Sequence, residues 1–287
     1  MKKKKRKYLT VILVSLLLVG LFLLLYPSVS NYINSLHQTK AIATYREQIS
    51  SMSDEDREYY LNEAYEYNQR IHLRANTYAP TDDERRQYDN ILNLSGDGVM
   101  GYVVIPAIDV SLPVYHGTSE RVLQNAVGHL DWTSFPVGGP GSHCVLSGHR
   151  GLPSAKLFTS LDQVAVNDVF MLCIMDEILT YKVDQILIVD PQDTAALEIT
   201  EGADYCTLLT CTPYGINTQR LLVRGHRIET AKEDAVVQIT SEAVQIEPLI
   251  VTSAIAVPLL LILVVTVFTV SWVKDKKSGK SLGGEQK

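Results

Sequence analysis

Residues 205–227 read YCTLLTCTPYGINTQRLLVRGHR, and they predict two adjacent β-strands joined by a turn. The first run ends at Cys211, Pro213 and Gly215 supply turn residues, and the second run begins at Arg220. Side chains alternate along a strand. One face therefore carries Tyr205, Thr207, Leu209 and Cys211, and the other carries Cys206, Leu208 and Thr210. Because a hairpin of this length brings the start of its second strand beside the end of its first, we expect Arg220 to lie near Cys211.

Upstream of this hairpin, the chain contains further short runs rich in Val, Ile, Leu and Tyr, separated by Pro and Gly. These runs are residues 99–105, 112–115, 143–147, 169–174, 178–183 and 185–189, and with 205–211 and 220–226 they make eight predicted strands. One short helix is expected around residues 120–126. Many short strands with little helix are typical of a mostly β protein built as a β-barrel.

The region before the first strand predicts helix. Residues 31–75 carry helical spacing, and Ser53 followed by three acidic residues predicts a helix start. This segment is expected to be a stalk or packing helix. Residues 76–98 contain Pro, Gly and charged residues and predict a loop with at most a short helix.

Both ends of the chain carry membrane-spanning signals. Residues 8–26 and 248–273 are apolar runs without a charge, and about 20 such residues suffice to cross a bilayer. Lysines flank the outer end of each run, and positive flanks stay in the cytoplasm. We therefore expect cytoplasmic termini and an extracytoplasmic domain. Cleavage of the first run as a signal peptide is the alternative to its retention as an anchor.

Charge and cysteine spacing exclude some functions. The net charge of −6 argues against nucleic acid as a partner. The four cysteines are Cys144, Cys173, Cys206 and Cys211. They contain no CxxC pair and so give no zinc-type spacing. An exported domain allows disulfides, and the sequence alone leaves their pairing open.

Cys211 is the candidate nucleophile because it ends a strand, where a substrate can reach it. Cys206, inside the strand, is expected to be a buried and inert thiol. A thiolate needs a neighbouring base or cation, and His149 lies in a turn between two glycines, in LSGHRG. Arg220 is the candidate group for stabilising an oxyanion. His116, His129 and His143 are expected to be structural or merely exposed, His226 has no obvious partner, and Arg224 and Arg227 are expected at a solvated strand edge.

Three segments closely resemble those of sortases. The stretch beginning at Thr207 is similar to the family motif TLxTC followed by an arginine eight or nine residues later. Residues 146–158, LSGHRGLPSAKLF, resemble the histidine motif, and residues 100–119 resemble the entry to the sortase barrel. The resemblance covers about residues 98–230. It implies a closed eight-stranded barrel in which His149, Cys211 and Arg220 are the acid/base, the nucleophile and the oxyanion or positioning group. It implies no metal or organic cofactor.

Within the family, the two anchors and the CTPYGIN stretch look most like class C, the pilin-polymerising sortases. This implies cleavage of an LPxTG-like sorting signal between Thr and Gly, followed by transfer to a pilin lysine. A housekeeping sortase that uses a cell-wall peptide amine is the alternative, and a non-catalytic anchored binding or scaffold protein is a remote one. Many class C members carry an Asp-Pro-aromatic plug in a lid. Residues 76–95 lack that tripeptide, which leaves Tyr78 or Asp82 as candidates to replace it.

The expected organisation places the chain at a cell membrane. It comprises a basic start and anchor helix at 1–30, a helical stalk and lid at 31–97, the catalytic barrel at 98–232, a linker at 233–247, a second transmembrane helix at 248–273 and a cytoplasmic tail at 274–287.

Overall fold

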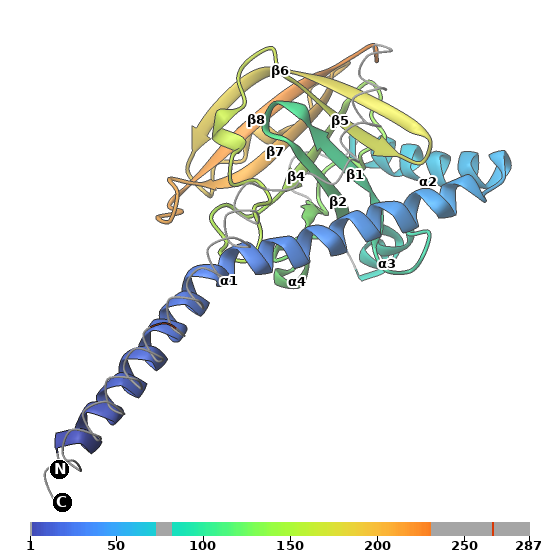
Figure 1. Ribbon diagram of the computed structural model, residues 1–287. Helices are drawn as coiled ribbons and strands as arrows, with labels where there is room; N and C mark the ends of the chain where they lie inside the picture. Colours follow the sequence, from blue (N-terminus) through green and yellow to red (C-terminus); the bar gives the residue numbers. More distant parts are fainter. Residues whose placement is uncertain (1, 73–81, 231–265, 267–287) are drawn as a thin grey trace, which may run out of the picture. The chain divides into compact units, whose positions relative to one another are not determined.

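A computed structural model describes residues 2–72, 82–230 and 266 (Figure 1). The chain divides into two compact units, of which one is Ser30–Val244 and the other includes Met1–Val29. Helix α1, Lys2–Ser50, contributes residues to both units and contains Pro27.

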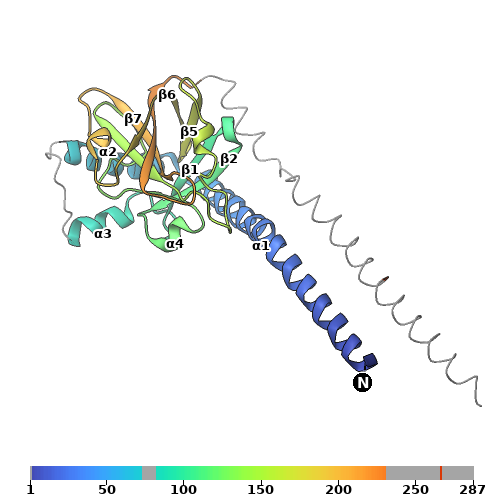
Figure 2. The ribbon, with the colours of Figure 1, turned by 90° about the vertical axis from the view of Figure 1, so that its left-hand side faces the viewer.

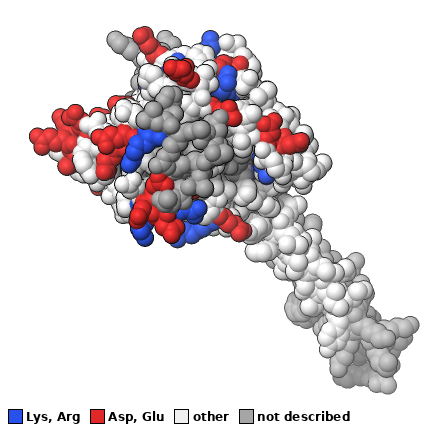
Figure 3. Space-filling model, turned by 180° about the vertical axis from the view of Figure 1, so that it is seen from behind, with Lys and Arg blue, Asp and Glu red and all other residues white. Residues whose placement is uncertain are grey.

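After its basic start, the first half of α1 is apolar. Among the described residues, Val11–Ser50 is the one helical stretch that is long enough and apolar enough to cross a membrane. Most large side chains between Tyr8 and Tyr26 are exposed, and Figure 3 shows this stretch without charged residues. The prediction of an apolar N-terminal helix is therefore confirmed. Apart from Thr266, the second predicted span lies outside the described residues.

The rest of the described chain is dominated by a closed barrel of eight strands in the order β1-β2-β3-β4-β7-β8-β6-β5, as expected. The strands are β1 Val99–Ile105, β2 Val110–His116, β3 Val127–His129, β4 Ser142–Ser147, β5 Val169–Ile174, β6 Glu177–Val189, β7 Asp204–Thr212 and β8 Gln219–Ile228. Two neighbouring pairs are parallel, β2–β3 and β4–β7, and the others are antiparallel. The short helices between strands are η1 Pro106–Ile108, α4 Glu120–Leu123, η2 Leu161–Gln163 and η3 Ala195–Leu197.

The strand count is right, but two assignments behind it are wrong. Residues 178–183 and 185–189 form one strand, β6, with a register shift between Val183 and Gln185. Asp184, which interrupts the apolar run, pairs with Arg224 across the sheet instead of ending the strand. Strand β3 was missed because it has only three residues, one of them glycine, and pairing with β2 and β4 defines it.

Helices of the Ser30–Val244 unit pack on the barrel (Figure 2). Helix α2, Asp54–His72, begins after Ser53, whose Oγ accepts the Asp56 amide at 3.1 Å, so the predicted helix start is confirmed. The hydroxyl of Tyr45 donates to Met100 O at 2.9 Å and accepts the Met175 amide at 2.8 Å. These buried contacts attach α1 to β1 and to the turn after β5.

Helix α3, Asp82–Asn90, is the short helix allowed for in the lid region. Its Tyr88 is buried and hydrogen-bonds His129 Nδ1 at 2.9 Å, which attaches α3 to β3. Of the two residues considered as a plug, Asp82 is exposed at the start of α3, and Tyr78 lies outside the described residues.

Candidate active site

Strand β7 carries the candidate nucleophile on the outer face of the barrel. Cys206, Leu208 and Thr210 are each 0% exposed and face the interior, whereas Leu209 and Cys211 are half-buried. The exposure of β7 follows the predicted alternation except at Thr207, which is 1% exposed and hydrogen-bonds His143 Nε2 at 2.8 Å. Beyond Thr212 the chain turns, with the amides of Ile216 and Asn217 donating to Pro213 O at 3.1 and 2.9 Å.

Arg220 lies directly across from Cys211. The two residues are Cα partners in the antiparallel β7–β8 ladder, as the hairpin spacing predicted. The Arg220 guanidinium donates to the carbonyls of Asn217 and Gln219 at 3.3 and 3.0 Å. These bonds hold a positive charge at the base of the turn that follows the thiol.

His149 approaches from the opposite side of β7. Strand β4 runs parallel to β7 with Ser147 opposite Leu209. The pairing continues one residue further, since the Gly148 amide donates to Leu209 O at 3.0 Å and Thr210 Oγ1 donates to Gly148 O at 2.7 Å. His149 lies two residues beyond Ser147, and Cys211 lies two residues beyond Leu209, the partner of Ser147. His149 and Cys211 are therefore level with each other along the two strands. The strand order β4-β7-β8 flanks Cys211 with His149 on one side and Arg220 on the other.

Gly148 is required at its position by close packing. A Cβ there would lie 2.7 Å from Cδ2 and 2.9 Å from Cγ of Phe158, whose side chain is fully buried. The Phe158 amide donates to His149 O at 3.1 Å. The loop after β4 is thus folded against the backbone of the histidine.

An apolar surface extends along the same outer face. It consists of buried Val145, Leu197 and Leu222, with Leu130, Trp132, Leu187, Val189, Ala196 and Leu209 packed around them. Leu209 precedes Cys211 by two residues and Leu222 follows Arg220 by two, so this surface begins directly beside the thiol. Its half-buried members, such as Leu209, are the ones that a bound peptide can contact.

The other three cysteines are too buried for a substrate to reach. Despite its burial, hydrogen bonds with Cys206 and His129 lower the pKa of the Cys144 thiol to about 6, but this thiol is only 2% exposed. Cys144 and Cys206 face each other in the β4–β7 register, and with Cys173 they are at most 2% exposed. All four thiols are free. Burial raises the pKa of the Cys173 thiol to about 12 and also raises the pKa of Cys206. The expectation that Cys206 is a buried thiol is confirmed, and Cys211 alone is partly exposed.

The remaining histidines are structural or paired. His129 is structural: it is fully buried in β3, where its Nε2 contacts Ser134 O at 2.8 Å. His143 Nδ1 donates to Glu198 O at 3.0 Å and Nε2 contacts Thr207 Oγ1 at 2.8 Å. His226 Nδ1 lies 3.8 Å from Asp184 Oδ2, so it does have a partner.

The prediction of a solvated strand edge at Arg224 is wrong. Strand β8 lies between β6 and β7, and Arg224 donates through Nε and Nη2 to Asp184, each at 3.0 Å. Its guanidinium also lies 4.2 Å from the centre of the Tyr205 ring. Arg227 packs 5.8 Å from the ring of Tyr181. Central strands have no free edge, and the sequence pattern alone could not show which strands flank β8.

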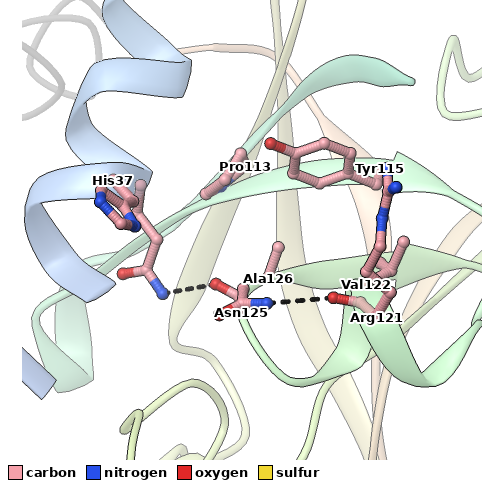
Figure 4. Close-up of a pocket in the computed structure, with 8 residues that line it drawn as sticks. His37, Pro113, Tyr115, Arg121, Val122, Asn125 and Ala126 are labelled. Carbon is pink, nitrogen blue, oxygen red and sulfur yellow. Dashed lines mark hydrogen bonds between the residues drawn. The ribbon is translucent and has the colours of Figure 1, made fainter. Parts of the chain in front are cut away.

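A separate pocket of ≈170 Å³ lies between α1, β2 and α4 (Figure 4). It is lined by His37, Gln38, Pro113, Tyr115, Arg121, Val122, Asn125 and Ala126, and so contains no candidate catalytic residue. Gln38 Nε2 donates to Asn125 O at 2.7 Å across one wall. Within the described ranges, no three His, Cys, Asp or Glu side chains gather to hold a metal ion.

A closed barrel with a partly exposed cysteine between a histidine and an arginine defines a thiol-dependent acyl-transfer class of protein. Comparison with known proteins makes the family explicit. The family model for the sortase domain matches residues 103–228. Sortase C1 from Streptococcus agalactiae is 47% identical, covers 67% of this chain and 100% of its own, and superposes with a TM-score of 0.66. The chain belongs to the sortase family of cysteine transpeptidases.

Two further relatives refine the comparison. Sortase C from Streptococcus pneumoniae, a structure described in terms of catalysis and pilin substrate specificity, is 42% identical over 67% of this chain and 97% of its own, with a TM-score of 0.61. Sortase A from Listeria monocytogenes is 28% identical over 49% of this chain and spans 61% of that relative's length. The expected resemblance to class C is confirmed by the two solved sortase C structures.

Proposed function

We propose that this chain is a membrane-anchored sortase that cleaves an LPxTG-like sorting signal between Thr and Gly and joins it to a pilin lysine. The observation that carries this proposal is the placement of Cys211 on β7, with Arg220 opposite it on β8 and His149 just beyond the end of β4 on the other side. Similarity to class C sortases supports the choice of pilin lysine as the acceptor amine.

The chemistry follows from the three side chains. The Cys211 thiolate attacks the carbonyl carbon of the signal threonine, and negative charge develops on the carbonyl oxygen beside Arg220. His149 in its protonated form donates a proton to the leaving glycine amine as the C–N bond breaks. This leaves a thioester on Cys211. The acceptor amine attacks the thioester, His149 takes the amine proton, and release of the thiolate forms the new amide.

The apolar surface beside Cys211 gives the signal a place to bind. A peptide whose threonine carbonyl lies at the thiol extends its preceding residues at about 3.3 Å per residue. The residues before the threonine then extend past half-buried Leu209, a member of that surface. Contact with it favours an apolar residue in this part of the signal.

Anchoring is supported by the apolar helix in α1. Its charge-free run follows Lys2, Lys3 and further basic residues, which keep the N-terminus cytoplasmic. The C-terminal apolar run would supply a second span that crosses in the opposite direction, since its lysine-rich flank follows it. The domain between them then acts at the outer face of the membrane.

The test uses the full chain in detergent micelles, a sorting-signal peptide and a purified pilin, with mass spectrometry of the products. We expect an amide bond between the signal threonine and a pilin lysine, and no product from Cys211→Ala. Full activity of that variant would refute the proposed mechanism.

The housekeeping alternative is favoured by one observation, the similarity to sortase A of Listeria monocytogenes. The same reaction run with peptidoglycan stem peptide as acceptor separates the two functions, because only the joined amine differs. A non-catalytic protein would form neither bond. It would also show no reaction of Cys211 with a mild alkylator, whereas we expect one labelled thiol per native chain and none in Cys211→Ala.

A further inference from the structure

Arg150, the residue after His149, is buried although it is charged. Its side chain is 9% exposed and forms an ion pair with Asp162, the second residue of η2. The guanidinium also lies 5.9 Å from the centre of the Tyr214 ring, in the turn between β7 and β8. Its Nε has no hydrogen-bond partner among the described residues.

Arg150 also reaches the strand of the nucleophile. Its Nη1 donates to Thr212 Oγ1 at 3.1 Å. On the other side of the histidine, Gly148 exchanges hydrogen bonds with Leu209 and Thr210. The residues on both sides of His149 are thus bonded to the residues on both sides of Cys211.

We propose that Arg150 is a positioning residue that sets His149 opposite Cys211, with Asp162 holding its guanidinium in place. This inference rests on the proposed function of the same site. Without the bond from Arg150 to Thr212, the hydrogen bonds of Gly148 would, among those of the described residues, be left to tie the start of the histidine loop to β7. His149 would then be held on one side of its position instead of both. A misplacement of about 1 Å in a catalytic group can cost about 100-fold in rate.

The planar guanidinium suits this task. It presents donors in a fixed fork, so one group serves Asp162 and Thr212 together. A lysine ammonium is a point charge on a flexible stem and holds one partner at a time with little directional control. The half-exposed Asp162 compensates the buried charge, and its loss leaves the cation unpaired.

The barrel provides a matched control in Arg224 and Asp184. This pair is also an arginine–aspartate bridge, at 3.0 Å, and its arginine also packs on a tyrosine ring. Its side chains are 22% and 25% exposed, so it is partly buried like the Arg150 pair. It joins β6 and β8 and contacts neither His149 nor Cys211. A purely structural effect should appear in both pairs.

The experiment measures kcat and KM for the sorting-signal peptide with the full chain in detergent, alongside thermal unfolding. We expect R150Q to lower kcat about 10- to 100-fold with KM changed less than about threefold, because positioning acts on the transition state. R150K should recover only part of the loss. R224Q should lose comparable thermal stability and keep kcat within about twofold.

Two further measurements separate positioning from stability. If Thr212→Val removes the same bond, the double variant R150Q/T212V should be no slower than R150Q alone. The rate of Cys211 alkylation by iodoacetamide from pH 5 to 9 requires no substrate. Its pH profile should change in R150Q and D162N and stay that of the native chain in R224Q.

The inference is overturned if R150Q lowers kcat no more than R224Q, or if it raises KM alone, which would place Arg150 in substrate binding. An alkylation profile unaltered in R150Q overturns it as well. Failure of the proposed function is a different result, namely a native chain that does not cleave the peptide or a Cys211→Ala variant that does. The alkylation comparison still decides the role of Arg150 in that case.

Discussion

Substitution of Gly148 by alanine tests how the histidine loop is held. The added Cβ would lie 2.7, 2.9 and 3.2 Å from three atoms of the Phe158 ring, all inside normal van der Waals contact. Overpacking of this kind costs about 1–3 kcal/mol, and removing a glycine from the unfolded chain returns about 0.4–1 kcal/mol. The net loss of about 1–2 kcal/mol corresponds to a fall in Tm of about 2–8 °C for a unit of this size.

The effect on catalysis is expected to be larger than the effect on stability. Phe158 is fully buried, so Gly148 itself must shift, and His149 shifts with it. We expect kcat/KM for the sorting-signal peptide to fall about 10- to 100-fold. The assay is peptide cleavage by the full chain in micelles, with unfolding followed by circular dichroism.

Gly225 provides the matched control. A Cβ there would lie 2.8 Å from Phe170 Cε1 and 2.9 Å from Tyr181 Cβ, so G225A should lose similar stability. Gly225 is remote from the histidine loop, and its variant should retain kcat/KM within about twofold. Shortening the aromatic in G148A/F158L should restore part of the activity. Equal loss of activity in G148A and G225A, or no loss in either, would refute this account of Gly148.

Two other predictions concern stability. Asn68 donates to Phe135 O at 3.1 Å and accepts the Phe135 amide at 2.7 Å, both buried, so N68A should cost about 2–4 kcal/mol in urea unfolding. The exposed neighbour Gln69→Ala should cost under about 0.5 kcal/mol, and equal effects would contradict the role of this contact. Burial lowers the pKa of His143. Below the ordinary pKa of about 6.5 the unfolded chain therefore binds a proton that the folded chain resists, so stability should fall between pH 7 and 5. H143Q should show a shallower dependence of Tm on pH, and an unchanged slope would exclude His143 as a source.

The part of the candidate active site that lies within one hairpin could be predicted from the sequence. The TLLTC run, its turn and the start of the next strand are contiguous, so strand alternation and hairpin spacing place Arg220 beside Cys211. The position of His149 beside that hairpin could not be predicted in the same way. The parallel pairing of β4 with β7 joins segments whose hydrogen-bonded residues, Gly148 and Thr210, are 62 positions apart. Periodicity within either segment does not reveal that contact. The turn between two glycines singled out His149, and the resemblance to sortase motifs implied its role.

Contacts between distant parts of the chain also explain why the predictions for Asp184, Arg224 and strand β3 were wrong. Asp184 looked like a strand break because a charge interrupts an apolar run, yet Arg224 from β8 compensates it. Arg224 in turn looked solvated because its partner lies 40 residues away. Strand β3 has too few residues to show a period of two, and its neighbours alone identify it. In each case the deciding interaction comes from another part of the chain.

The parallel β4–β7 pair has a consequence for the order of assembly. Hairpins such as β1–β2, β5–β6 and β7–β8 close short loops and can form early, whereas β4 and β7 must meet across the whole of β5, β6 and their connections. His149 and Cys211 therefore become neighbours only as the barrel closes. An unfinished chain already contains Cys211, but its His149 does not yet lie beside β7. In the proposed mechanism, cleavage of the sorting signal therefore begins only when the fold is complete.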